Sequence, residues 1–513
     1  MAATRAFTPR LPTEVERMIF SCLPNTDLKN VRLSNKQWSA SAAMILWKEL
    51  TIDLIDSNTR NVVTILDSNS NGILDNLKNL SISTCKGFLS QPLQQQVNIS
   101  LLVLLGTLKR DCLNAFISSE YALSKYELGI LLRNQTQIKK LAVSLTTDKG
   151  GPPGENYIKG ALLVLEELFI KTSGTEHHAY QGYFHWFAHT PNLRKLCIEG
   201  RVRSATACFD AWALPDQTPL LKLHTLELSH VQLYDLPRNI VDCLHVPSLQ
   251  FLEISECENV SSLLGSFTAA FNKTSDIFLE YLSISSSESA EDLSGSLEGF
   301  LEAIAGVSTI RLAFTSGNLP GPRSLIRCGP TLKSLRISHR DPECLYTPQE
   351  LQQLVESCPN LVWIALDLVN LSDTIDAMPP FAHLHVSTSA NSGAILHALA
   401  TSLETLAGLA KLKMLWLTHR PWMGRVSNAA ERRWRHTQIA NEIMGILADN
   451  DSPVHTLCFC PLYRDRGDIF SVTDEDGNMW PYYTYNRGVV SLFEDDSAKA
   501  RTVAVPSKDH SWD

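Results

Sequence analysis

The sequence lacks the motifs that mark the common nucleotide-binding and hydrolytic sites. Its 513 residues hold no P-loop, dinucleotide-binding fingerprint, HExxH zinc motif or nucleophile elbow. The glycine-rich run at 150–154 contains two prolines, which have no N–H to donate to a phosphate, and no Lys-Ser or Lys-Thr follows it. No cysteine is marked as an activated nucleophile by electropositive neighbours. These absences predict a protein that is not an enzyme.

A strong basic charge, long apolar runs and paired cysteines are also missing. The net charge of −9 gives no support for nucleic-acid binding, and the basic run at 431–436 is typical of a solvated helix face. The longest apolar stretch, at 99–105, is far shorter than a membrane span, and no signal peptide opens the chain. The twelve cysteines are scattered without paired spacings. We therefore expect a cytoplasmic or nuclear protein, or both, with neither nucleic acid nor membrane as a partner.

Candidate metal ligands are few and poorly placed. His185 and His189 lie four residues apart, which suits zinc on a helix, but no third ligand is evident. Cys458 and Cys460 alternate along a predicted strand, so that their side chains point to opposite faces. Surface or core histidines are the better interpretation of the first pair. The sequence predicts no metal site and no cofactor.

Three short amphipathic helices are predicted in residues 11–50. Thr13 with Glu16, and Ser34 with Gln37, have the spacing of capping boxes, and Asp27 is placed to cap the helix between them. The apolar residues recur at helical spacing in each segment. They are Val15, Met18, Ile19, Cys22 and Leu23 in the first helix, Leu28, Val31 and Leu33 in the second, and Trp38, Ala42, Ile45 and Leu46 in the third.

This segment resembles an F-box. The opening Leu11-Pro12-x-Glu14, the pair Asp27-Leu28, the run from Ser34 to Trp38 and the closing Leu46-Trp47 stand at the spacing of that family. The run at 33–36, LSNK, departs from the usual Val-Ser-Arg-basic sequence, which puts adaptor affinity in question. The resemblance implies binding to a Skp-family adaptor and, through it, to a cullin. The adaptor contacts it implies are Leu11, Pro12, Ile19, Leu23, Leu28, Trp38, Leu46 and Trp47.

A repeat fills most of the remaining chain. Its copies read apolar, two variable residues, apolar, one variable residue, apolar, and eleven of the fourteen intervals between the fifteen copies measure 25 to 31 residues. The copies start at Trp47, Leu77, Leu113, Ile138, Leu165, Leu193, Leu223, Leu249, Leu279, Val307, Leu332, Leu361, Phe381, Leu412 and Val454.

The pattern is typical of leucine-rich repeats, in which each unit adds one strand to a curved parallel sheet and a helix outside it. Helices are predicted between the strands at 124–133, 351–357 and 429–447, and proline-containing turns such as 190–192, 329–331 and 358–360 precede several copies. The predicted fold is therefore α/β: a leucine-rich-repeat solenoid with outer helices, preceded by a small three-helix F-box. We expect the third F-box helix to dock on the first repeats through Leu46, Trp47 and Leu50.

The sequence divides into three predicted domains. Residues 1–50 form the F-box, 51–461 the repeat solenoid, and 462–513 a C-terminal hairpin, capping segment and tail. Within the last part, the aromatic and β-branched residues at 469–473 and 479–485 flank an acidic turn and predict a hairpin. The charged and small residues beyond about Glu494 predict a frayed tail.

The alternation of side chains along a strand places the third, fifth and seventh residues of each copy on the concave face. This face is rich in aromatic, Arg and His residues in the later copies, and such residues dominate protein interfaces. We therefore expect an unknown protein target there, unless the C-terminal segment covers the same residues; both alternatives stay open. The candidate target contacts are Arg311, Arg336, Trp363, Asp367, His385 and Trp416.

Taken together, the sequence and the resemblance imply a non-catalytic substrate receptor of an SCF-type ubiquitin ligase. The alternative is a repeat scaffold that works in protein interactions outside a ligase.

Overall fold

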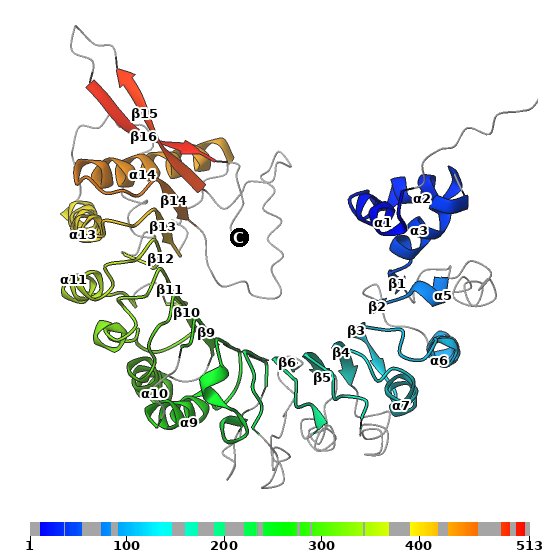
Figure 1. Cartoon of the computed structure of the whole chain (residues 1–513). Helices are drawn as coiled ribbons and strands as arrows, with labels where there is room; N and C mark the ends of the chain where they lie inside the picture. The colour runs from blue at the N-terminus through cyan, green and yellow to red at the C-terminus, as the bar shows by residue number, and fades with distance from the viewer. Residues whose placement is uncertain are drawn as a thin grey trace, which may run out of the picture. The chain divides into compact units, whose positions relative to one another are not determined.

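A computed structural model describes most of the chain (Figure 1). The residues it describes are 11–34, 36–53, 73–83, 91–145, 160–172, 189–200, 220–231, 233, 240–273, 278–287, 290–341, 344–368, 390–418, 429–459, 484–492 and 499–507. The chain forms two compact units. The first comprises residues 1–232 and 236–245, and the second comprises residues 233–235 and 246–513.

The first unit begins with three helices, α1 (Thr13–Ser21), α2 (Asn25–Ser34) and α3 (Lys36–Leu46). Phe20, Leu28 and Ala42 contribute one buried side chain from each helix, and Leu23, Val31, Ile45 and Leu46 pack against them. The ring of Trp38 meets that of Phe20 edge to face, with 6.1 Å between the centroids. This small core holds the three helices together.

The helices begin differently from the prediction. Thr13 lies inside α1, whose first turn follows Pro12 and has no side-chain cap. Its expected partner, Glu16, is buried and accepts a hydrogen bond of 2.9 Å from the Ser41 hydroxyl of α3. Ser34 ends α2 and donates to the carbonyl of Val31 instead of capping α3. Both predicted capping boxes were therefore wrong, because Glu16 accepts from a donor on α3 and Ser34 donates within the last turn of its own helix.

Seven parallel strands follow in the described part of the first unit, each hydrogen-bonded to the next in chain order. They are β1 (Glu49–Asp53), β2 (Asn79–Ser83), β3 (Ala115–Leu123), β4 (Lys140–Leu145), β5 (Glu167–Thr172), β6 (Lys195–Glu199) and β7 (Thr225–Ser229). Helical segments between or after them are α5 (Ile73–Asn76), α6 (Gln91–Thr107), α7 (Lys125–Asn134) and η6 (Ile240–Cys243). The predicted helix at 124–133 is confirmed, with Ser124 and Glu127 forming its capping box.

The second unit continues in the same way and then changes direction. Strands β8 to β14 pair in parallel in chain order, whereas β14–β15 and β15–β16 pair antiparallel. Figure 1 shows helices α9, α10, α11, α13 and α14 along one side of these strands. The elements in order are η7 (Val246–Ser248), β8 (Phe251–Ser255), α9 (Val260–Asn272), β9 (Tyr281–Ser286), α10 (Ala290–Ala303), β10 (Thr309–Phe314), η8 (Pro322–Leu325), β11 (Ser334–His339), α11 (Pro348–Ser357), β12 (Trp363–Ala365), α13 (Ala390–Ala407), β13 (Met414–Leu417), α14 (Ala429–Asp449), β14 (Thr456–Phe459), β15 (Thr484–Leu492) and β16 (Lys499–Pro506).

The repeat register predicts the strands closely. Each of β1 to β14 begins two residues after the start of a predicted copy. In β10, Ile310 and Leu312 are buried, whereas Arg311 and its neighbours at alternate positions are half-buried. The copy predicted at Phe381 lies outside the described residues, and β12 pairs directly with β13. We call the side of the sheet opposite the apolar residues the polar face.

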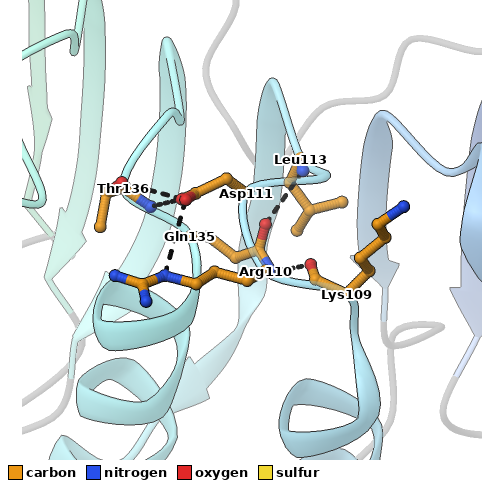
Figure 2. Close-up of polar contacts among 6 residues, drawn as sticks. All are labelled: Lys109, Arg110, Asp111, Leu113, Gln135 and Thr136. Carbon is orange, nitrogen blue, oxygen red and sulfur yellow. Dashed lines mark hydrogen bonds and ion pairs between the residues drawn. The ribbon is translucent and has the colours of Figure 1, made fainter.

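Polar side chains link successive turns (Figure 2). The buried Gln135, after α7, accepts a 3.0 Å hydrogen bond from the Leu113 amide and donates one of 2.8 Å to the Lys109 carbonyl. Asp111, whose φ of 55° is left-handed, accepts from both the amide and the hydroxyl of Thr136. These contacts satisfy backbone groups that the strands leave unpaired and fix the start of β3 relative to β4.

Three proline-containing turns are also joined to the preceding turn by a hydrogen bond from a side chain to the backbone. The residue after each proline donates from its side chain to a backbone carbonyl of the preceding turn: Asn192 to Leu163, Thr331 to Val307 and Asn360 to Pro330, at 2.7, 3.0 and 2.8 Å. At Gly329, a Cβ atom would lie 2.0 Å from the Ser357 carbonyl oxygen. The turn before β11 therefore requires glycine, because no side chain fits between the two backbones.

The C-terminal region was predicted less well. The hairpin expected at 469–485 lies almost entirely outside the described residues. Strand β16 (Lys499–Pro506) contradicts the predicted frayed tail, since it pairs with β15 along its whole length. Tyr485 is fully buried at the start of β15. The centroid of its ring lies 6.0 Å from that of the Phe459 ring, and the two rings meet edge to face. Its register partner is the buried Leu457, so Tyr485 extends the apolar core of the last parallel strands.

Candidate protein-binding surfaces

The three N-terminal helices present apolar side chains to solvent. Met18 is 71% exposed and Leu33 is 85% exposed, because the helical core is built from the opposite sides of α1 and α2. An unpartnered set of large apolar groups of this kind marks a surface that another molecule covers. We call this set the helical apolar surface, and its exposed members are Leu11, Val15, Met18, Ile19, Leu33, Trp38 and Met44.

The predicted adaptor contacts divide into two groups. Leu11, Pro12, Ile19 and Trp38 are exposed and lie where a partner can reach them. Leu28 is only 1% exposed and belongs to the core of the three helices. Its motif position therefore reflects packing, and we correct its placement among surface contacts.

The other predicted contacts lie in or beside the helical core. Leu23 and Leu46 pack against the helical core. Trp47 is half-buried, with the Arg32 guanidinium 5.7 Å from its ring centroid. Strand β1 begins two residues after Trp47, and its Leu50 lies opposite Leu80 of β2. Met18 and Leu33, which the prediction of contacts omitted, are the most exposed apolar side chains of these helices; their helical spacing was the available signal.

The second unit carries a different surface on the polar face of β8 to β13. Parallel pairing aligns one row of residues across the strands: Glu253, Ser283, Arg311, Arg336, Ala365 and Trp416. A second row, two residues earlier, contains Phe251, Tyr281, Thr309, Ser334, Trp363 and Met414. Four of the six predicted target contacts, Arg311, Arg336, Trp363 and Trp416, therefore come together in two adjacent rows.

Arg336 lies between the two tryptophans. Its Cζ atom is 3.5 Å from the ring centroid of Trp363 and 5.5 Å from that of Trp416, and the two rings meet edge to face at 5.7 Å. Ala365 separates Arg336 from Trp416 in the row and is fully buried. Its methyl group leaves room for the guanidinium to approach Trp416, which a larger residue would block. Cation–π attraction therefore positions the Arg336 side chain.

Arg311 has a similar setting one strand earlier. Its Cζ atom is 5.2 Å from the ring centroid of Tyr281, and Tyr281 stacks on Phe251 with centroids 4.0 Å apart and planes at 3°. Burial raises the pKa of Tyr281, so that its hydroxyl stays neutral. Two arginines thus stand side by side, each with aromatic rings along one side. We call Phe251, Tyr281, Arg311, Arg336, Trp363 and Trp416 the arginine–aromatic cluster.

The two remaining predicted target contacts do not join this cluster. Asp367 lies two residues after Ala365 of the first row and accepts a hydrogen bond from the Thr418 hydroxyl, so that its carboxylate is engaged across the strands. His385 lies outside the described residues. Trp416 is only 8% exposed, so its ring packs beside Arg336 and is not freely available to a partner.

The described residues hold no cluster of metal-ligating side chains, and burial makes several of their thiols less reactive. Within them, no three His, Cys, Asp or Glu side chains gather as a metal site would require. Burial raises the pKa of the Cys328 thiol to about 11 and that of Cys358 to about 12, and it also raises the pKa of Cys112 and Cys344. These thiols are therefore less nucleophilic than an exposed cysteine. None of the helices in this part of the chain is long and apolar enough to cross a bilayer.

The geometry thus defines an α/β protein with a long, mostly parallel sheet and an N-terminal helical segment that offers an apolar surface to a partner. Residues 8–53 match the family model described as F-box-like. The match includes all three helices and ends at Asp53, the last residue of β1. F-box-like domains generally bind Skp-type adaptors. No curated protein matches the chain.

Proposed function

We propose that this protein is the substrate-recognition subunit of an SCF-type ubiquitin ligase, with a Skp-family adaptor and a cullin as partners. The observation that carries the proposal is the helical apolar surface within the F-box-like match. Covering Met18, Ile19 and Leu33 with an apolar partner would remove a large exposed area from water. The two-residue link from α3 to β1 then transmits the adaptor's position to the sheet.

The strands belong, in this proposal, to a leucine-rich-repeat solenoid that presents the target. The support is the constant offset of two residues between the start of a copy and the start of its strand, from β1 to β14. A register kept over so many units predicts identical backbone geometry in each one. The polar face is then free to vary in sequence without disturbing the core, as a recognition surface requires.

The proposed mechanism needs no catalytic group in this chain. The cullin scaffold brings a charged conjugating enzyme near the bound target, and the transfer chemistry takes place on that enzyme. The contribution of this protein is to raise the effective concentration of the target's lysines. The raised pKa values of Cys328 and Cys358 favour this non-catalytic role over a thioester intermediate on either thiol. The setting we propose is the cytoplasm, the nucleus or both.

The direct test is recovery of a Skp adaptor by the purified chain. Ile19→Glu places a charge in the helical apolar surface, and the helical core should stay intact because Ile19 is exposed and is not part of that core. We expect this variant to lose adaptor binding by at least about tenfold. Ile99→Glu is the matched control, because Ile99 is also exposed on a helix, α6, but lies outside the match. Equal adaptor recovery by the two variants would contradict the proposal.

The alternative function is an interaction scaffold that binds an adaptor without a ligase. Recovery of both adaptor and cullin with the wild-type chain supports the ligase. Recovery of the adaptor alone, under conditions in which a known receptor recovers both, supports the scaffold.

A further inference from the structure

The arginine–aromatic cluster has cationic groups that the described residues leave without counter-ions. No ion pair joins Arg311 or Arg336 to any residue described by the structure, although the two side chains are half-buried and adjacent. The Nε atoms of both arginines and Nε1 of Trp363 are buried, and none of them has a hydrogen-bond partner in that part of the chain. A buried donor without an acceptor costs folding free energy, and so do like charges side by side. Such a cost is typical of a site whose partner is a ligand.

We propose that this cluster binds a phosphate group carried by a side chain of the target protein. The proposal rests on the function proposed above only in naming the target as the carrier. A phosphomonoester brings a charge of about −1.5 to −2 and three acceptor oxygens. This charge matches that of the two adjacent guanidinium groups, Arg311 and Arg336. A carboxylate would neutralise only one charge and has only two oxygens.

The aromatic rings supply the rest of the site. The ring centroid of Trp363 lies 3.5 Å from Cζ of Arg336, so the ring packs against one side of the guanidinium. This packing restricts the guanidinium before an anion binds, and less conformational entropy is therefore lost on binding. Tyr281 and Phe251 form an apolar wall beside Arg311, against which carbon atoms flanking the phosphate can pack. Free phosphate would gain nothing from this wall. A phosphorylated side chain would, so the geometry favours the latter.

The nearby acidic groups do not occupy the site. Glu253 lies in the same row as Arg311 but is separated from it by Ser283 of β9. Asp367 lies two residues after Ala365, diagonally from Arg336, and its carboxylate accepts a hydrogen bond from the Thr418 hydroxyl. Neither carboxylate forms an ion pair with the two arginines in the described structure. The two arginines therefore form a local positive charge, although the net charge of the chain is −9.

The experiment is calorimetric titration of the full chain with N-acetyl-phosphotyrosine amide and N-acetyl-phosphoserine amide. The comparison ligands are the unphosphorylated amides, N-acetyl-glutamate amide and inorganic phosphate. The variants are Arg311→Gln, Arg336→Gln and Arg336→Lys, with Arg340→Gln as the matched control, because Arg340 is exposed at the end of the same region. Arg336→Lys retains a cation and guards against a folding defect in Arg336→Gln, and circular dichroism checks every variant.

We expect the phosphorylated amides to bind the wild type and Arg340→Gln equally, and to bind Arg311→Gln and Arg336→Gln about tenfold or more weakly. Arg336→Lys should fall between them, because it keeps the charge but loses the planar fork. Four results would overturn the proposal: no binding to the wild type, equal binding to all folded variants, glutamate binding as tight as phosphate, or inorganic phosphate binding as tightly as the phosphorylated amides. A short single-stranded RNA that binds more tightly than the amides would also overturn it, in favour of a nucleic acid.

The test can fail independently of the proposed ligase function. Arg311 and Arg336 lie outside the F-box-like match, so all of these variants should still recover the Skp adaptor. Loss of phosphate binding with adaptor recovery intact would locate the defect in the cluster alone. Failure of the adaptor experiment with Ile19→Glu leaves the phosphate result unaffected.

Discussion

The polar faces of the two units use charge in opposite ways. In the first unit, lysines pair with glutamates across neighbouring strands: Lys140 with Glu167, Lys171 with Glu199 and Lys195 with Glu227, at 2.9, 3.2 and 2.6 Å. In the second unit, Arg311 and Arg336 lie side by side against aromatic rings. The two faces share one backbone register and similar buried residues. The difference shows that the core specifies the strands, whereas the polar face is free to be either internally neutralised or prepared for a ligand.

The largest effect should come from breaking the register that carries the arginines. Gly329→Ala places a Cβ atom 2.0 Å from the Ser357 carbonyl oxygen, in the turn before β11. We expect the second unit to lose about 3 kcal/mol of unfolding free energy, because backbone must move to relieve the overlap. Urea denaturation followed by circular dichroism measures this loss.

The matched control for that variant is Gly295→Ala in α10, where a Cβ atom would meet nothing within 4 Å. This substitution should raise the unfolding free energy by about 0.5–1 kcal/mol, since alanine restricts the unfolded chain and favours the helix. If both variants unfold at the same urea concentration, the close approach at Gly329 has no energetic consequence and our account of the turn is wrong.

A second prediction converts the polar face of the second unit to the type found in the first. Ser334 stands two residues before Arg336 on the same face and diagonally from Arg311. Ser334→Glu should supply an internal counter-ion and weaken binding of phosphorylated amides by about tenfold. Ser334→Gln, of equal size but neutral, should retain most of the affinity. Titration calorimetry on the two variants decides whether charge or bulk controls the site.

The pH dependence of phosphate binding gives a third prediction. Burial and the neighbouring Arg311 lower the pKa of Arg336 to about 9, and a phosphomonoester loses its second proton near pH 6. Affinity should therefore rise as the pH increases through about 6, where the dianion forms, and fall above about 9, where Arg336 loses its charge. Arg336→Lys should retain the lower limb of this profile. An affinity that stays constant from pH 5 to 7 would show that the second phosphate charge is not recognised.

The smallest effect should come from unpairing a lysine in the first unit. Burial alone would lower the pKa of Lys195, but the hydrogen bond and charge of Glu227 raise it overall. A raised pKa of a cation stabilises the fold at pH values below the ordinary lysine pKa, and this contribution is lost as the pH rises through the folded value. Glu227→Gln should therefore cost about 0.5 kcal/mol at neutral pH, and less in 1 M salt.

The control for this pair is Glu166→Gln, which removes from Lys139 a partner that is more exposed than Glu227. No measurable change in the denaturation midpoint is expected there. If Glu166→Gln and Glu227→Gln have the same effect, partial burial of the second pair does not contribute.

The sequence predicts the strands well because periodicity records which residues are buried. A copy such as LRKLCI at Leu193 places Leu196 and Ile198 in the core, and β6 begins two residues after its start. The same reasoning failed where local patterns have several uses. Glu16 and Ser34 each belong to a predicted capping box. In the structure, Ser34 ends a helix and Glu16 accepts a hydrogen bond from Ser41. The sequence pattern does not show which hydrogen-bond partner the folded chain will bring to such a side chain.

The candidate sites were predictable in part for the same reason. Strand alternation predicts that Arg311, Arg336, Trp363 and Trp416 share a face, and the register confirms that they do. It could not predict that Ala365 makes room between Arg336 and Trp416, or that the two arginines lack an acidic neighbour in contact. These depend on side-chain geometry across strands far apart in sequence. In the F-box-like helices, the exposure of Met18 and Leu33 likewise depends on how the three helices pack.

The pairing of β1 with β2 has a consequence for how this protein should be truncated. Residues 49–53 are both the end of the F-box-like match and the terminal strand of the sheet in the described structure. Removing residues 1–50 would delete the three helices of the F-box-like match together with Glu49 and Leu50 of β1, and would thereby uncover the hydrogen-bonding edge of β2 at Asn79 and Leu80. Uncovered edges recruit other strands and promote aggregation. Strand β1 therefore also protects the edge of β2 from pairing with other strands. A point substitution such as Ile19→Glu changes the helical surface and leaves this strand in place, which a deletion cannot do.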